Sequence, residues 1–131
     1  PNISCVPNAL IALSPIVDTS KKGFGHDLFD SPDDANVATP SKHIGKHIPP
    51  MLILHGTKDR VLPMEAVARF AKAVSRKNSC DLAAFEGRDH AFYNFNVDPE
   101  GYDAALLEMD RFLVSKGFLL EGHDFTDGIV E

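Results

Sequence analysis

The sequence has few cysteines, no long apolar run and fewer basic than acidic residues. Cys5 and Cys80 lie far apart and form neither a disulfide framework nor the paired pattern of a zinc site, so they leave the compartment open. No apolar stretch approaches the roughly 20 residues that a helix needs to cross a bilayer, so we expect no membrane partner. The 13 Lys and Arg are scattered among 19 Asp and Glu, for a formal net charge of -6. We expect no nucleic-acid partner, because binding a phosphate backbone needs clustered basic side chains.

Three short apolar runs predict β-strands in a chain of 131 residues, which is the length of one domain. They are Ala9–Leu13, closed by a serine and a proline, Met51–His55, ended by a glycine, and the shorter Cys80–Phe85. The first two runs are continuously apolar, which is typical of parallel strands that are buried on both faces.

Two further segments have apolar side chains at helical spacing. The first follows the second strand, begins near Pro63 and ends near Arg76 to Asn78. The second ends near Gly117, since glycine commonly follows the last helical residue. The positions predicted to face the core are Met64, Val67, Phe70, Ala71 and Val74 in the first helix, and Tyr102, Ala105, Leu106, Met109, Phe112 and Leu113 in the second.

The order of these elements predicts an α/β fold. A strand, a long loop over residues 18–50, a strand, a helix, a strand and a helix are typical of a parallel sheet covered by helices. About three strands are too few for a complete sheet of this kind, because an unpaired edge is left. We therefore expect residues 1–131 to form a partial single domain, with an incomplete sheet that strands from elsewhere complete. A loop as long as 18–50 is usually functional.

Asp59 and His90 are the candidates for catalysis. Asp59 ends the segment HGTKD after the second strand, and His90 follows the third strand, 31 positions later. Functional groups of open α/β sheets gather past the carboxyl ends of the strands, so the two loops can bring these side chains together. A fixed carboxylate selects the tautomer of an imidazole and stabilises the imidazolium that forms during proton transfer. The two residues therefore predict the acid and the base of a catalytic triad.

Several segments resemble the C-terminal portion of α/β-hydrolase esterases, particularly carboxylesterase and acetyl-xylan-esterase-like proteins related to the prolyl oligopeptidase family. The resemblance covers residues 7–10, 14–18 and 23–26, the motifs around Asp59 and His90, and the final helix. It implies a three-layer sandwich, Asp59 as the triad acid, His90 as the general base, and carboxylic esters, including acetylated sugars, as substrates. It also implies that the loop after the first strand borders the substrate pocket. No cofactor and no metal are expected.

The nucleophile of such an enzyme is missing from the sequence. No serine or cysteine lies in a Gly-x-Ser-x-Gly turn, and Cys5 precedes a strand instead of following one. Removing the serine of a triad can cost about 10^6-fold in kcat, so we expect this chain alone to be inactive. Its expected partners are a small-molecule ester and the N-terminal half of the same hydrolase domain.

Other interpretations stay open. The two candidate residues could be a turn former and a surface side chain, and Asp89 is a second candidate for the acid, although neighbouring side chains rarely reach the second imidazole nitrogen. His43 and His47 have the spacing of metal ligands on a helix, and the acidic loop 18–34 could hold calcium, but both patterns are incomplete. The same acid and base also serve peptide hydrolysis or a cysteine-dependent lactonase. From another class, a noncatalytic α/β binding or interaction module needs about five strands.

Overall fold

A parallel sheet forms the centre of the computed structural model, which describes residues 3–122. In chain order the elements are β1 (Leu10–Leu13), η1 (His26–Leu28), α1 (Pro32–Val37), η2 (Pro40–Lys42), β2 (Met51–Gly56), α2 (Met64–Ser75), β3 (Cys80–Phe85) and α3 (Pro99–Ser115), where η marks a 3-10 helix. The strands lie in the order β1-β2-β3, and both neighbouring pairs are parallel.

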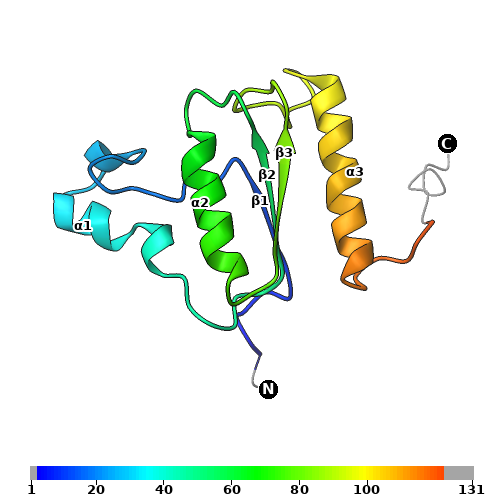
Figure 1. The fold of residues 1–131 in the computed structure, drawn as a ribbon, viewed down its shortest axis with the longest axis horizontal. Coiled ribbons are helices and arrows are strands. Elements are labelled where there is room, and N and C mark those ends of the chain that lie inside the picture. Colours follow the sequence, from blue (N-terminus) through cyan, green and yellow to red (C-terminus); the bar gives the residue numbers. More distant parts are fainter. Residues whose placement is uncertain (1–2, 123–131) are drawn as a thin grey trace.

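The helices α2 and α3 cover opposite faces of this sheet, so the described chain has three layers (Figure 1). The predicted α/β fold, with parallel strands and covering helices, is confirmed. The predicted domain of residues 1–131 also includes residues 1–2 and 123–131, which lie outside the described residues.

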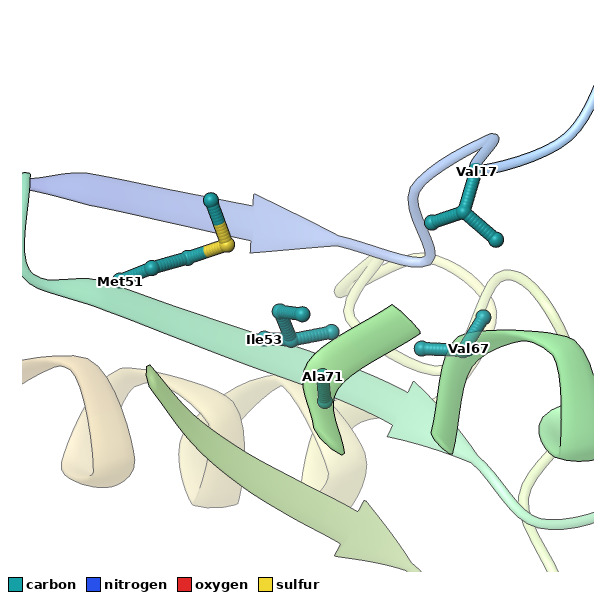
Figure 2. Packing of buried hydrophobic residues seen from close by; sticks show 5 residues of the cluster. All are labelled: Val17, Met51, Ile53, Val67 and Ala71. Atoms are coloured by element: carbon teal, nitrogen blue, oxygen red, sulfur yellow. The ribbon is translucent and has the colours of Figure 1, made fainter. Parts of the chain in front are cut away.

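The central strand β2 supplies both cores, because successive side chains of a strand point to opposite faces. All six of its residues are buried. Burial of an aliphatic side chain stabilises a fold by about 1.5–3 kcal/mol, and Ile53 and Leu54, on opposite faces, are both fully buried. The core under α2 consists of Val17, Met51, Ile53, Val67 and Ala71 (Figure 2), and the core under α3 consists of Leu52, Leu54, Phe92, Ala105 and Phe112.

Two predictions about burial are wrong. Residues Leu10–Leu13 of β1 are only half-buried, because β1 is an outer strand of the described sheet and has a neighbouring strand, β2, on one side only. The central strand β2 is therefore more deeply buried than the outer strand β1. In α3, Leu106 is 43% exposed although its spacing matches the predicted apolar stripe. Ala105 and Phe112, which belong to the same stripe, are buried as predicted.

The segment 18–50 is mostly irregular, as predicted, and its regular parts are the short helix α1 and two 3-10 turns. The Ser31 hydroxyl accepts a hydrogen bond from the Asp34 amide at 3.1 Å and so caps the start of α1. The Thr19 hydroxyl donates to the Ala35 carbonyl at 2.6 Å. These bonds connect parts of the segment with one another, and Val17, directly before it, joins the core under α2.

Candidate active site

Asp59 lies in a tight turn directly after β2. Its Oδ1 atom accepts hydrogen bonds from the backbone amides of Val61 and Leu62, both at 2.8 Å. The Asp59 side chain is completely buried. The turn thus fixes the carboxylate through one oxygen and leaves the other oxygen, Oδ2, for a partner.

That partner is His90, from the loop after β3. The His90 Nδ1 atom lies 2.9 Å from Asp59 Oδ2, and the His90 side chain is 33% exposed. Because Nδ1 faces the carboxylate, the proton sits on Nδ1 when the imidazole is neutral, and Nε2 is free to accept a proton. The structure therefore brings together the two residues that the sequence singled out.

The electrostatics of Asp59 favour the charged form of its carboxylate. Burial alone raises the pKa of Asp59, but hydrogen bonds from the Leu62 amide, the His90 imidazole and the Val61 amide outweigh it and hold that pKa below its ordinary value. A carboxylate that is ionised at neutral pH can stabilise a positive charge on the imidazole of His90.

The two loops approach each other closely at the ends of β2 and β3. The Lys58 amide donates to the Arg88 carbonyl at 2.9 Å, and the Gly87 amide donates to the Thr57 hydroxyl at 2.8 Å. A Cβ atom on Gly56 would lie 2.3 Å from the Arg88 carbonyl oxygen, so only glycine allows this approach.

Asp89, the other candidate for the acid, binds different groups. Its Oδ1 accepts hydrogen bonds from the backbone amides of His90 at 2.8 Å and Arg60 at 3.1 Å. Its Oδ2 lies 2.6 Å from a terminal guanidinium nitrogen of Arg60. These donors lower the pKa of Asp89 to about 2, with the His90 amide as the largest cause. The imidazole Nδ1 of His90 therefore contacts Asp59, whereas Asp89 joins the loop after β2 to the loop after β3.

Comparison with known proteins shows which folds this chain resembles. The BD-FAE family model matches residues 13–74. Native esterase 2 of the planctomycete Thermogutta terrifontis has a TM-score of 0.74 and 33% identity over 89% of this chain and 45% of its own. The form phosphonylated by cyclosarin has a TM-score of 0.74 and 38% identity over 86% of this chain and 42% of its own. This chain is related to the α/β-hydrolase esterases.

The match covers only part of each solved esterase. The chain spans less than half the length of the solved esterase chains named above. No protein with a curated description matches it. The family resemblance predicted from the sequence is confirmed, and the three parallel strands with their covering helices are part of an esterase fold.

Two polar residues near the carboxyl ends of β1 and β2 were not identified as candidates from the sequence. Ser14, directly after β1, is buried, has a positive φ of 42°, and donates from its hydroxyl to the His90 carbonyl at 3.2 Å. His55, in β2, is fully buried, and its Nε2 lies 2.9 Å from the Leu62 carbonyl and 3.6 Å from Asp59 Oδ2. A polar residue at the end of each apolar run was the available signal.

The loop that carries His90 is also tied to the start of α3. Arg88 forms ion pairs with Asp98 and Glu100. Asp98 caps α3 by accepting a hydrogen bond from the Gly101 amide at 2.9 Å. The hydrogen bond from the Gly101 amide holds the pKa of Asp98 below its ordinary value despite partial desolvation, and the Arg88 guanidinium adds to the effect. The loop is therefore held from β2 on one side and from α3 on the other.

One cleft borders His90, and another lies beside the residues that follow Asp59. The first has a volume of about 490 Å³ and is lined by His90 and by apolar side chains that include Val61 and Val97. The second, of about 510 Å³, lies between the segment after β1 and the start of α2, and Phe24 and Leu62 contribute to its walls. Part of the 18–50 segment thus lines a cleft next to the Asp59 turn.

The remaining candidates have no such geometry. His43 follows a 3-10 turn and its ring contacts the Val37 carbonyl, while His47 has a positive φ of 66°, so the two do not share a helix face. Among residues 3–122, no three His, Cys, Asp or Glu side chains gather as they would around a metal ion. Within the same residues, no helix has the length and apolar character that a bilayer crossing requires.

Proposed function

We propose that this chain supplies the acid, Asp59, and the general base, His90, of a serine hydrolase that acts on carboxylic esters. The observation that carries the proposal is the 2.9 Å contact between His90 Nδ1 and the buried Asp59 Oδ2, past the ends of adjacent parallel strands. In α/β-hydrolases the acid precedes the histidine along the chain, which is the order found here. The nucleophilic serine comes from a segment outside this chain, and the chain alone is inactive.

The proposed mechanism follows from the two nitrogens of His90. Nε2 removes the proton of the serine hydroxyl as its oxygen attacks the ester carbonyl, and then gives that proton to the departing alcohol. Asp59 accepts the Nδ1–H bond throughout, so it keeps Nε2 unprotonated before the attack and stabilises the imidazolium after it. Water then hydrolyses the acyl-enzyme by the same proton transfers in the opposite direction.

Small carboxylic esters are the proposed substrates, and sugar acetates are one class among them. Solved structures of Thermogutta terrifontis esterase 2 contain bound butyrate or propionate. Beside His90, the 490 Å³ cleft has an apolar wall that includes Val61 and Val97, which suits a hydrocarbon group of an ester. We propose that residues 1–131 form part of one domain, whose N-terminal half is the partner that completes the site.

Replacing His90 tests the proposal in the whole enzyme that contains this chain. With p-nitrophenyl butyrate as the probe, His90→Ala should lower kcat by up to about 10^6-fold, as in a triad hydrolase of another fold. Asp59→Asn should lower it by about 10^4-fold, because the amide favours the wrong imidazole tautomer. His43→Ala is the matched control, since that exposed histidine contacts a carbonyl in another part of the chain.

Undiminished hydrolysis by the His90→Ala enzyme would overturn the proposal. The noncatalytic binding module, the alternative from another class, predicts no effect of either substitution on any ester hydrolysis. That alternative leaves the buried and ionised Asp59 beside an imidazole unexplained, whereas the hydrolase requires it.

A further inference from the structure

The carboxylate of Asp89 joins the loop that carries Asp59 to the loop that carries His90. Its Oδ1 atom accepts one hydrogen bond from the backbone amide of His90 at 2.8 Å and another from the backbone amide of Arg60 at 3.1 Å. Arg60 directly follows Asp59, so the same oxygen binds the backbone of the base and the residue next to the acid. The carboxylate is therefore a bridge between two segments that lie 29 positions apart.

We propose that Asp89 is a positioning residue, whose Oδ1 sets the distance between the Asp59 turn and the His90 loop and thereby the alignment of the imidazole with its acid. This inference rests on the proposed function, because alignment matters only if Asp59 and His90 carry out proton transfer. It assigns a role to a side chain that does not contact the imidazole nitrogens.

The other contacts between the loops do not replace this bridge. The Lys58 amide binds the Arg88 carbonyl, and the Gly87 amide binds the Thr57 hydroxyl, so both tie the loops before the acid and before the base. The bridge of Asp89 acts beyond them, at the residues that carry the reacting side chains. Without it, the backbone amides of Arg60 and His90 would form hydrogen bonds with water instead, and the His90 backbone would lose one of the hydrogen bonds that hold it in place.

Geometry, and not charge, is the property of Asp89 that this role requires. Its second oxygen pairs with the guanidinium of Arg60, whose side chain is 87% exposed. Exposed ion pairs contribute little to stability. Two variants separate the properties: Asp89→Asn keeps an oxygen at the same distance from the backbone and loses the charge, whereas Asp89→Glu keeps the charge and moves the oxygens by one methylene group.

The experiment measures kcat and KM for p-nitrophenyl butyrate in the whole enzyme carrying Asp89→Asn, Asp89→Glu or Arg60→Met, with melting temperature as a control for folding. We expect Asp89→Glu to lower kcat by about 100-fold with little change in KM, because a displacement of about 1 Å from productive geometry costs this much. Asp89→Asn should keep kcat within about tenfold of the wild type, a loss equivalent to one modest hydrogen bond. Arg60→Met should leave kcat nearly unchanged.

Opposite ranking of the two Asp89 variants, with Asp89→Glu active and Asp89→Asn impaired, would overturn the inference, as would two fully active variants. A second readout is the low-field proton NMR signal of an Nδ1–H held between imidazole and carboxylate, which should weaken in Asp89→Glu and persist in Asp89→Asn. Because this signal needs no turnover, it tests the positioning even if His90→Ala hydrolyses the ester and the proposed function fails. If His90→Ala is inactive and the signal is unchanged in both Asp89 variants, the inference alone fails.

Discussion

A methyl group added at Gly56 should separate the loops of Asp59 and His90. The Cβ atom of Gly56→Ala would lie 2.3 Å from the Arg88 carbonyl oxygen, 2.8 Å from its carbon and 2.9 Å from the Asp89 carbonyl oxygen. All three are backbone atoms, so no change of side-chain rotamer relieves the contact. The loop after β3 has to move away from the end of β2.

The size of this movement follows from ordinary contact distances. Moving the Arg88 oxygen from 2.3 Å to the 3.4 Å of an ordinary contact requires a separation of about 1 Å. The same shift would take the 2.9 Å contact between His90 Nδ1 and Asp59 Oδ2 beyond hydrogen-bonding range. We expect kcat/KM to fall by about 100-fold, and the free energy of unfolding to fall by about 1–3 kcal/mol, as for other overpacked sites.

Ester hydrolysis and urea denaturation of the whole enzyme measure the two effects. Gly45→Ala is the matched control, because a Cβ atom there meets nothing within 4 Å. A Gly56→Ala enzyme with the kcat/KM and the unfolding midpoint of the wild type would refute the reasoning, since the two loops could then not lie as close as described.

Two further predictions concern pH and a buried histidine. The amides of His90 and Arg60 lower the pKa of Asp89 to about 2, so its stabilising contribution is complete above the unfolded value of about 3.9 and is lost as pH falls toward 2. Melting temperatures of the wild type and Asp89→Asn should therefore converge only below about pH 4, and a constant difference down to pH 2 would contradict this. His55→Leu leaves the Leu62 carbonyl without its partner and should lower the free energy of unfolding by about 1–3 kcal/mol in urea denaturation. His55→Gln, which keeps a donor, should lose less, and equal losses would argue against the hydrogen bond.

Local patterns were sufficient to predict the central strands and α2. The predicted strand Cys80–Phe85 has the observed bounds of β3. The predicted start of α2 lies one residue before Met64, and its predicted end lies one to three residues after Ser75. Apolar runs and helical spacing depend on nearest neighbours along the chain, which the sequence contains. Leu106 failed because periodicity indicates a face of the helix and does not say how wide the covering core is.

The pairing of Asp59 with His90 was predictable for a related reason. Both residues follow parallel strands that are neighbours in the sheet, and the carboxyl ends of such strands lie at one edge. The sequence could not say which atoms would meet. Asp89 is next to His90 in sequence, yet its carboxylate reaches the Arg60 amide, and Asp59 receives the imidazole.

The sequence by itself determined the parallel α/β arrangement, the two cores of β2 and the edge at which the candidate residues gather, because these follow from local periodicity and strand direction. Only the tertiary structure decided the bridge of Asp89, the burial of His55 and the bond from the Ser14 hydroxyl to the His90 carbonyl, whose partners are 76 positions apart. Such contacts depend on the path of loops through space and on side-chain rotamers. Loop path and rotamer are chosen only when the strands have paired and the helices have packed.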